Sequence, residues 1–444
     1  MNKDSVFDEI QGEEIVDQLA NVVHLSEMEH RLREWLMKLG KLLLQVWLVW
    51  LTPRYHAVRV VCPHCEGRAE YVRQRRATLR TMFGIIGYRR AYYLCRQCQR
   101  GHYPLDEKLG LRPNGLSAEV ERLAGLVGVQ MPFEQGSLIF EALTLVKLSD
   151  HSIAQATRRY GQQVVEQETE WQDLAQDANY LEQTTRTQNA PLRLYGALDG
   201  GRVLIRPHQT EPQRWRELKV GAWFTARGQP PRHPDDTWSI RAQDITYFTD
   251  IGGCADFGEL MWASGVQRHA HHAPELIFLG DGARWIWDMV DFHFPHAVQI
   301  VDWFHACEYL MPVAKSAFAD ETQQKQWVSE VKTALWQGRL DTVIAACTTY
   351  LVPRRPDDPA HKAVTYYTNN RHRMDYPTYR AQGYQIGSGT IESGVKQIAS
   401  QRMKVAGARW NLDHARLVAK ARAAFLSQQW DALTAATLHA ASTH

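Results

Sequence analysis

The chain has 444 residues, enough for about two to four domains, and its 44% of hydrophobic residues excludes a disordered protein. A formal net charge of +2 leaves a nucleic-acid partner open, so the distribution of charge along the chain must decide. Four of the seven cysteines stand in Cys-x-x-Cys pairs, which points to metal-bound or reduced thiols and not to a secreted disulfide framework. Because the sequence has no signal-peptide profile and no apolar stretch of bilayer length, we expect a cytoplasmic protein without a membrane partner.

Residues 1–53 are predicted to form an N-terminal helical arm, because apolar residues recur at helical spacing from residue 12 to residue 51. Pro53 closes this helical pattern. Two interpretations of the arm are open. It packs as an amphipathic helix against its own chain, or it joins two copies of the protein as a dimerisation arm.

Residues 54–110 are predicted to form a zinc ribbon. Cys62-Pro-His-Cys65 and Cys95-Arg-Gln-Cys98 can each form a tight turn that presents two thiolates. Four thiolates make a closed tetrahedral site, which is typical of structural Zn²⁺. The residues between the pairs predict a β-hairpin, because β-branched and aromatic residues are frequent over Thr78–Ile86 and Tyr88–Tyr93.

The same hairpin carries a surplus of positive charge. Between Cys65 and Gly101 there are nine arginines, but the only acidic residues are Glu66 and Glu70. Arginine beside tyrosine suits phosphate contact and stacking, so we expect DNA contact here rather than a merely solvated basic surface. The residues expected to contact DNA are Arg75, Arg76, Arg89 and Arg90.

Residues 111–188 are predicted to form a helical, helix-turn-helix-like DNA-binding region followed by a polar linker. Ser149 or Asp150 is a suitable cap for a helix over Ser152–Tyr160. That helix would end with Arg158 and Arg159, which are expected to contact DNA in a major groove. The alternative is an ordinary pair of packed helices.

Residues 189–430 show short apolar strands that alternate with helices, which predicts an α/β domain. The first strand ends at Asp199 and two glycines, and further strands are expected at Arg202–Ile205 and Glu217–Thr225. A meander of three strands with an aspartate on the first begins an RNase H-like mixed sheet. The next apolar run, Leu276–Gly280, predicts a buried parallel strand with Asp281 at its carboxyl end, where α/β sheets bind ligands.

The third acid of interest, Glu392, follows a serine and a threonine that can cap a helix, so it should project from a first helical turn. Lys396, Arg402 and Lys404 come next and are expected to face DNA. Asp250, Asp256 and Asp288 are competing acids that lie less favourably relative to the predicted strands.

Three carboxylates on separate elements suit phosphodiester transfer by two divalent ions, which activate the attacking oxygen and stabilise the leaving oxygen. Mg²⁺ prefers hard oxygen ligands and keeps several waters, so few carboxylates suffice, and Mn²⁺ accepts the same donors. We therefore expect catalytic Mg²⁺ or Mn²⁺ at Asp199, Asp281 and Glu392, with one aspartate bridging both ions. A single Asp-Gly pair often marks only a turn, but three acids in sheet order make that interpretation weaker.

These motifs resemble a known family. Ala197-Leu-Asp199-Gly-Gly, Leu279-Gly-Asp281-Gly-Ala and Gly387-Ser-Gly-Thr-Ile-Glu392-Ser-Gly resemble the acidic triad of DDE transposases, most closely those of the ISKra-type bacterial insertion sequences. Asp302-Trp-Phe-His305 resembles the Asp-x-x-His signature of Mutator-like transposases, which implies that His305 touches the scissile phosphate or a nearby strand. A histidine with a purely structural role is the alternative.

The resemblance covers nearly the whole chain and implies a helical insertion, here about residues 306–385, before the glutamate. The expected function is that of an insertion-sequence transposase that binds element ends, then cuts double-stranded DNA and joins it to a target at the bacterial nucleoid. A homo-oligomer, dimer or larger, is expected, because two ends of the element must be bound together. Residues 431–444 are expected to form a C-terminal tail. Two alternatives are open: a catalytically inactive transposase-derived DNA-binding protein, and an RNase H-like nuclease without strand transfer.

Overall fold

The computed structural model describes residues 24–52, 57–112, 115–207, 214–229, 231–234, 236, 239–352 and 357–434. Residues 1–23 of the predicted arm and residues 435–444 of the predicted tail lie outside these ranges. The chain divides into two compact units, one formed by residues up to Tyr160 and from Trp430 onward, the other by Gly161–Gln429. No helix within the described ranges has both the length and the apolar composition needed to cross a membrane.

The first unit contains a four-stranded antiparallel sheet in the order β1-β2-β3-β4. The hairpin predicted between the two cysteine pairs is confirmed, because β2 and β3 pair along nearly their whole length and turn between Thr81 and Gly84. Gly84 has a φ of 93°, a left-handed conformation that favours glycine. The strands are β1 (Arg59–Val61), β2 (Arg68–Thr81), β3 (Gly84–Cys95) and β4 (Gly101–His102).

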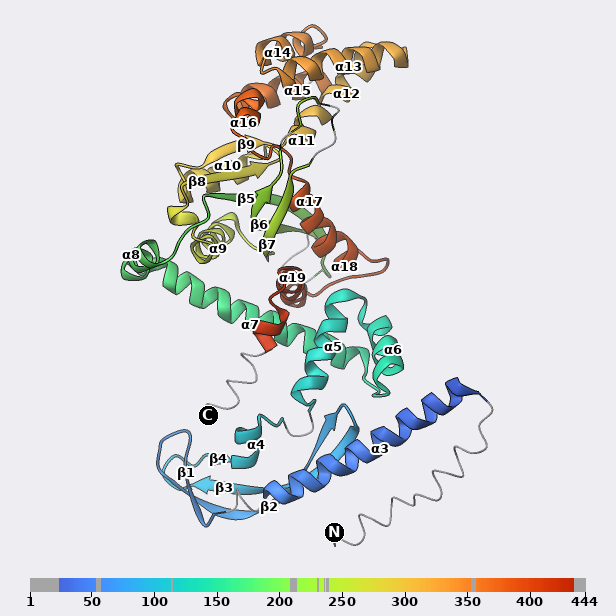
Figure 1. Ribbon diagram of the computed structural model, residues 1–444, viewed down its shortest axis with the longest axis vertical. Coiled ribbons are helices and arrows are strands. Elements are labelled where there is room, and N and C mark those ends of the chain that lie inside the picture. Colours follow the sequence, from blue (N-terminus) through green and yellow to red (C-terminus); the bar gives the residue numbers. More distant parts are fainter. Residues whose placement is uncertain are drawn as a thin grey trace. The chain divides into compact units, whose positions relative to one another are not determined.

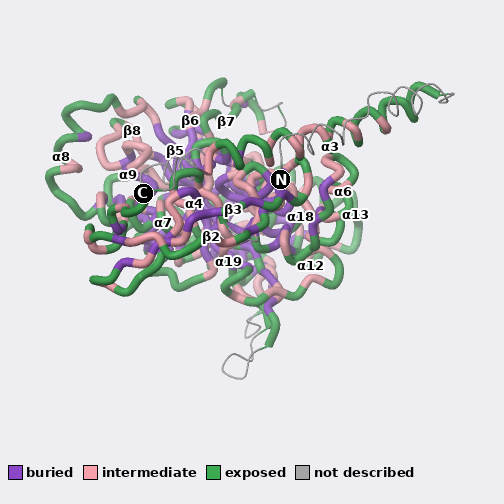
Figure 2. The backbone as a smooth tube through the Cα atoms, turned by 90° about the horizontal axis from the view of Figure 1, so that it is seen from below, coloured by how far each residue is buried: buried purple, intermediate pink, exposed green. Residues whose placement is uncertain are grey.

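Helix α3 (Leu25–Leu51) packs against this hairpin. Leu48 is buried in a cluster with Leu79 and Ile86 of the two long strands, and Leu44 packs against the same cluster. The described part of the arm therefore packs on its own chain, in agreement with the first of the two interpretations. Figure 2 shows long exposed stretches of α3, and dimerisation through the arm stays a prediction.

The helical region of the first unit includes a helix that is longer than the sequence suggests. The predicted helix over Ser152–Tyr160 is part of α7, which begins at Asp150 and continues to Gln176, so the prediction that it ends after Arg159 is wrong. Residues 161–176 contain one glycine and no proline, and therefore no strong stop signal. The helices here are α4 (Pro104–Leu109), α5 (Ala118–Gln130), α6 (Phe133–Thr144) and α7 (Asp150–Gln176).

The second unit is built on a five-stranded mixed sheet in the order β7-β6-β5-β8-β9, which confirms the predicted α/β class (Figure 1). Strands β5, β6 and β7 are successively antiparallel. Strand β8 runs parallel to β5, and β9 runs parallel to β8. The strands are β5 (Arg193–Leu204), β6 (Trp215–Arg227), β7 (Arg241–Asp250), β8 (Glu275–Gly280) and β9 (Val298–Val301).

Strand β5 is continuous, so Asp199 lies inside the strand rather than at its end. The prediction of a separate strand at Arg202–Ile205 is wrong, because β5 continues through Gly200 and Gly201 and stays paired with β6. Gly201 marks a close approach and not a turn. A Cβ at Gly201 would lie 2.9 Å from the side chain of Ala399, in the segment that follows α17 (Gly389–Val395).

Helices cover both faces of this sheet (Figure 1). On one face, the indole N–H of Trp223 donates a hydrogen bond of 3.0 Å to Ser264 of α9 (Cys254–Gln267). Trp223 pairs with Gly196, so these two residues share one face of the sheet. Gly201 lies five residues further along β5, and residues an odd number apart on a strand point to opposite faces, so Gly201 and α17 belong to the other face. The other helices around the sheet are α8 (Ala178–Thr187), α10 (Arg284–His293), α18 (Gln401–Met403) and α19 (Leu412–Leu426), with a π-helical turn at Lys396–Ser400.

The predicted helical insertion lies between β9 and α17, and Figure 1 shows α12–α15 gathered beyond the sheet. Its core contains Trp303 and Trp336, whose rings meet edge to face at 4.8 Å. Both tryptophans are buried, so they serve packing rather than base stacking. The helices are α11 (Trp303–Glu308), α12 (Leu310–Ala317), α13 (Glu321–Trp336), α14 (Leu340–Thr348), α15 (Pro359–Asn369) and α16 (Tyr376–Ala381).

Candidate active site

Asp199 lies on β5, and Asp281 directly follows the neighbouring parallel strand β8 at the same level. Ala197 of β5 pairs with Leu279 of β8, and each aspartate follows its paired residue by two positions. Since parallel strands keep their register, the two carboxylates stand next to each other across the strand pair. Asp281 follows the end of β8 directly, as the sequence predicts.

Glu392 reaches the same region from α17. It lies in the first turn of this helix, which packs on β5 and β6. Asp199 shares a strand face with Gly201, because residues two apart on a strand point to the same side. At Gly201 the end of α17 and the segment after it lie close to β5, so Asp199 faces the side of the sheet that carries Glu392.

The charges of Asp281, Glu392 and His305 all act on Asp199. Burial, together with the negative charges of Asp281 and Glu392, raises the pKa of Asp199 to about 6, while the Gly200 N–H and the charge of His305 oppose this shift. A carboxyl with a raised pKa beside two other carboxylates is a site that a cation would stabilise. Asp199, Asp281 and Glu392 therefore offer oxygen ligands that suit Mg²⁺ or Mn²⁺.

Asp302, the first residue of the Asp-x-x-His motif, is a further residue of this region for which the sequence predicts no role. It follows β9 directly, and its neighbour Val301 pairs with Gly280, so Asp302 stands level with Asp281. The fully buried Asp302 carboxylate accepts hydrogen bonds from the backbone N–H of His305 at 2.6 Å and from the backbone N–H of Ser388. The signal was present in the sequence, because an aspartate before a helix commonly caps it.

His305 connects Asp302 to Glu392. Its Nδ1 lies 3.1 Å from a carboxylate oxygen of Asp302 and 3.9 Å from a carboxylate oxygen of Glu392. The hydrogen bond to Asp302 raises the pKa of His305 to about 9, although burial opposes the shift. His305 is therefore protonated at neutral pH, and a protonated imidazole donates hydrogen bonds but has no lone pair for a metal ion.

The Glu392 carboxylate is also held from its own helix. The hydroxyl of Ser388 donates a hydrogen bond of 2.8 Å to Glu392, instead of capping the helix as its place in the sequence suggests. The potential ligand atoms of Asp302, His305 and Glu392 all lie within 4.8 Å of one another. Because His305 carries a proton, we interpret this cluster as a support that orients Glu392 toward the two aspartates.

The basic residues predicted after Glu392 divide into two groups. Lys396 and Lys404 are exposed, as contact with DNA requires. The prediction for Arg402 is wrong, because this side chain is only 1% exposed and its guanidinium lies 5.3 Å from the ring centre of Trp410. Burial lowers the pKa of Arg402 to about 10, and Arg402 belongs to the interior of the second unit.

In the first unit, the four arginines predicted for DNA contact occupy both faces of the hairpin. Arg75 pairs across the strands with Arg90, and Arg76 pairs with Arg89. The prediction for Arg90 is wrong, because Arg90 is buried in an ion pair with Asp106 and packs on the ring of Tyr103.

Of the remaining hairpin arginines, Arg75 lies over the ring of Tyr92 at 4.3 Å. Arg76 and Arg89 are exposed and directly opposite each other. Two like charges in this arrangement repel, so the pair is better suited to an anionic partner than to the free sheet.

The arginines of α7 are less available than the sequence suggests. Arg159 forms an ion pair with the buried carboxylate of Glu121 on α5. Arg158 is half-buried, and burial lowers its pKa. Packing of α7 within the first unit explains both positions, and a role for this helix in a major groove stays a prediction.

The four cysteines of the predicted ribbon form a cluster at metal-binding distance. The Sγ atoms of Cys62 and Cys98 are 3.7 Å apart, and those of Cys65 and Cys95 are 3.6 Å apart. A tetrahedron of Zn–S bonds of about 2.3 Å places its sulfurs about 3.8 Å apart. Backbone N–H groups of Cys98 and Gln97 lower the pKa of the Cys95 thiol to about 7, which favours the thiolate. This geometry is compatible with structural zinc.

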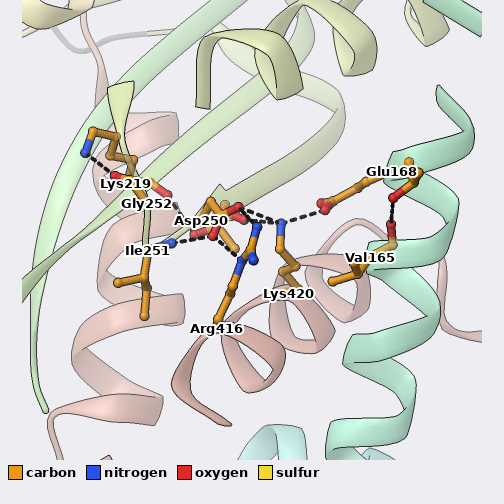
Figure 3. Close-up of polar contacts among 10 residues, drawn as sticks. Val165, Glu168, Lys219, Asp250, Ile251, Gly252, Arg416 and Lys420 are labelled. Atoms are coloured by element: carbon orange, nitrogen blue, oxygen red, sulfur yellow. Dashed lines mark hydrogen bonds and ion pairs between the residues drawn. The ribbon is translucent and has the colours of Figure 1, made fainter. Parts of the chain in front are cut away.

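Asp250, one of the competing acids, belongs to a separate buried ion cluster (Figure 3). Arg416 donates two hydrogen bonds of 2.6 Å to the Asp250 carboxylate. The Lys420 ammonium lies between Asp250, at 3.5 Å, and Glu168 of α7, at 2.5 Å. Two cations already neutralise these two acids, so Asp250 connects β7, α7 and α19 and has no role as a metal ligand.

No known protein family and no curated protein matches the sequence of this chain.

Proposed function

We propose that this protein is a DDE transposase whose second unit is an RNase H-like catalytic domain. The observation that carries the proposal is the convergence of Asp199, Asp281 and Glu392, from two neighbouring strands and one helix, on one region of the sheet. Neighbouring carboxylates repel one another, and a cation bound between them would relieve that repulsion.

The order of the strands supports the proposed fold. Three antiparallel strands, β5 to β7, are followed by two strands parallel to β5 on its other side. One acid lies on the first of these strands, another follows the fourth, and the third comes from the helix after the insertion. This is the arrangement that the likeness to DDE transposases implies.

In the proposed reaction, Asp199, Asp281 and Glu392 would hold Mg²⁺ or Mn²⁺. When bound, such ions activate an attacking oxygen and stabilise a leaving oxygen on phosphorus. The protein's own groups orient the reactants. Asp302 and Ser388 hold His305 and Glu392 in place, and protonated His305 can donate a hydrogen bond to a phosphate oxygen.

Exposed cations supply the proposed DNA contacts. In the second unit, Lys396 and Lys404 follow Glu392 and are exposed. In the first unit, Arg76 and Arg89 form an exposed basic pair on the hairpin that the cysteine cluster stabilises. Binding to element ends by a homo-oligomer would then place a scissile phosphate at the carboxylates.

The test is cleavage of labelled double-stranded DNA that carries the repeats flanking this gene. We compare the wild type, Asp281→Ala and the matched control Asp256→Ala, an exposed acid of α9, with Mg²⁺, with Mn²⁺ and without added ion. The proposal expects metal-dependent cutting and joined products for the wild type and for Asp256→Ala only. Equal products from Asp281→Ala would contradict it. Cutting without joining would indicate a nuclease, and binding without cutting would indicate an inactive DNA-binding protein.

A further inference from the structure

A hollow of about 700 Å³ lies beside Asp281, between α10 and α15. Its wall begins with Gly282, the residue directly after Asp281, and continues along both helices to Asn370 and Arg373. The hydroxyl of Tyr366, also in this wall, donates a hydrogen bond of 2.8 Å to the backbone carbonyl of Asp281. The hollow therefore adjoins the backbone of Asp281, one of the proposed metal ligands.

Hydrogen-bond donors and positive charges dominate the lining. Arg284, Lys362 and Arg373 contribute three cations, and Asp288 is the one carboxylate among the lining residues. Arg284 is almost fully exposed and lies 3.3 Å from Asp288, so water weakens this pair. Lys362 forms a similarly exposed pair with Asp357 at 3.2 Å, whereas Arg373 is held by Gln299. Arg284 and Lys362 are therefore the cations that suit the phosphate oxygens of an anionic ligand.

Trp287, a buried residue of this wall, carries a donor without a partner. The residue is only 3% exposed and lines the hollow. Its indole Nε1 is buried and has no hydrogen-bond partner among the described residues. A buried donor without an acceptor costs about 1–3 kcal/mol, which an acceptor on a bound molecule would recover.

Aromatic rings form another part of the wall. Tyr309 and Tyr366 stack with ring centres 3.9 Å apart and planes inclined by 18°. Stacked rings beside cations suit a flat heterocycle attached to a phosphate, since bases stack on aromatic side chains and phosphates pair with Arg and Lys. The volume also falls within the range of about 300–1,000 Å³ that is usual for ligand sites.

We propose that this hollow binds one nucleotide of the DNA strand adjacent to the phosphodiester at Asp281. The cations of Arg284 and Lys362 contact its phosphate, the Tyr309–Tyr366 pair contacts its base, and an acceptor on the nucleotide satisfies Trp287 Nε1. This inference rests on the proposed function, because it takes the catalytic carboxylates to lie at Asp281. The hollow would fix the position of the strand relative to the phosphate that is cut.

The test uses a matched pair of substitutions on α15. Thr365 and Thr368 are both exposed threonines of this helix, but only Thr365 lines the hollow. Thr365→Glu introduces a negative charge into the hollow, and Thr368→Glu adds the same charge outside it. A second variant, Trp287→Phe, removes the unpaired donor and keeps an aromatic ring in the core. Thermal unfolding of the full-length proteins verifies that all of them fold.

The readout is photocrosslinking of single-stranded oligonucleotides that carry 5-iododeoxyuridine at successive positions from the end of the repeat, without added divalent ion. We expect crosslinks to peptides containing Tyr309 or Tyr366 in the wild type and in Thr368→Glu, at least about tenfold fewer in Thr365→Glu, and fewer in Trp287→Phe. Equal crosslinking by both glutamate variants would overturn the inference. A second combination of results would also overturn it. If a free deoxynucleoside monophosphate or inorganic phosphate suppresses the crosslink, and Thr365→Glu still binds the oligonucleotide as well as the wild type does, the hollow binds a free ligand and not the DNA strand.

Failure of this inference can be distinguished from failure of the proposed function. Crosslinking needs no cleavage, so loss in Thr365→Glu supports the nucleotide site even if the wild type never cuts DNA. Conversely, metal-dependent cleavage with no crosslink at Tyr309 or Tyr366 supports the transposase and contradicts the hollow.

Discussion

Asp302 and Ser388 are the residues that join the helical part of the candidate site to the sheet. Asp302 is fully buried, yet its carboxylate accepts two backbone hydrogen bonds and holds the imidazole of His305. The Ser388 hydroxyl donates a hydrogen bond to the Glu392 carboxylate. Such supporting hydrogen bonds fix the direction of a metal-binding carboxylate, so their loss should weaken metal binding before it affects folding.

We therefore predict that Ser388→Ala lowers metal-dependent cleavage by about 10- to 100-fold and raises the Mg²⁺ concentration needed for half-maximal activity. The cost to folding should be about 1 kcal/mol, the usual net value of one hydrogen bond. The matched control is Ser393→Ala, an exposed serine of the same helix. An unchanged Mg²⁺ dependence in Ser388→Ala would show that Glu392 needs no such support.

At this scale the sequence predicts the acids better than the cations. Asp199 and Asp281 are recognisable because each precedes a glycine in or after an apolar run, and Glu392 is recognisable because it lies near a predicted helix start. Arg90 and Arg402 look equally suited to DNA in a list of basic residues, but they are buried. Arg90 contacts Asp106 and Arg402 contacts Trp410 in the interior, and no local sequence pattern predicts either contact.

Among the elements, the hairpin of β2 and β3 depends on the cysteine cluster at its open end. The thiols join the turn before β2 to the turn after β3, and the local core around them is small. A bound metal ion should therefore supply much of the stability of this end of the sheet.

Metal analysis of the purified protein should find one zinc ion per chain, and Cys95→Ser should lose it. Because the ion would hold the two turns together, we also expect the variant or a chelated sample to lose protection from amide hydrogen exchange in β1–β4. Exposed Cys254→Ser is the matched control and should keep its zinc. Full zinc content in Cys95→Ser would contradict a four-cysteine site.

Helix α7 is connected to β7 and α19 by the buried ions of Asp250, Lys420 and Glu168, and the more exposed Arg416 also binds Asp250 (Figure 3). Burial alone raises the pKa of Asp250, but the hydrogen bonds of Arg416 and the charge of Lys420 outweigh it and hold the pKa below its ordinary value. A lowered pKa means that the contact stabilises the fold above the ordinary pKa of an aspartate. That stabilisation is lost as the pH falls through the lowered pKa.

Replacing Arg416 with glutamine should lower the free energy of unfolding by about 1.5–3 kcal/mol at neutral pH, the usual value for hydrogen bonds to a charged group. The difference from the wild type should shrink as acid protonates Asp250. Urea unfolding at neutral and acidic pH measures both effects. Arg371→Gln, which breaks an exposed ion pair with Asp341, is the control and should change stability little. A difference that is constant with pH would show that the Asp250 contact is not responsible.

The strands and helices were predictable to different degrees. The β2–β3 hairpin and strand β8 agree with their apolar and aromatic patterns. Strand β5 was divided wrongly because Gly200 and Gly201 usually signal a turn, whereas here a neighbouring helical segment needs the space. The full length of α7 was missed because its middle is polar, and contacts such as Lys420 with Glu168 support it there.

On the scale of the whole molecule, the chain combines a basic, cysteine-bearing unit with a mixed-sheet unit that carries the acids. The local pattern of the sequence indicates both, since the cysteine pairs and the acid-bearing strands lie in separate regions. It does not indicate the hollow beside Asp281, which forms only when α15 of the insertion packs near α10. The central claim is that the three converging acids bind divalent ions.

The most direct measurement of that claim is Mn²⁺ binding, followed by electron paramagnetic resonance, for the full-length protein with DNA of the element end. The wild type should bind Mn²⁺, Asp199→Asn should lose most of this binding, and Asp256→Asn, which changes an exposed acid of α9, should bind like the wild type. If Asp199→Asn instead binds as much Mn²⁺ as the wild type, the three acids do not form the metal site and the proposed catalytic centre is wrong.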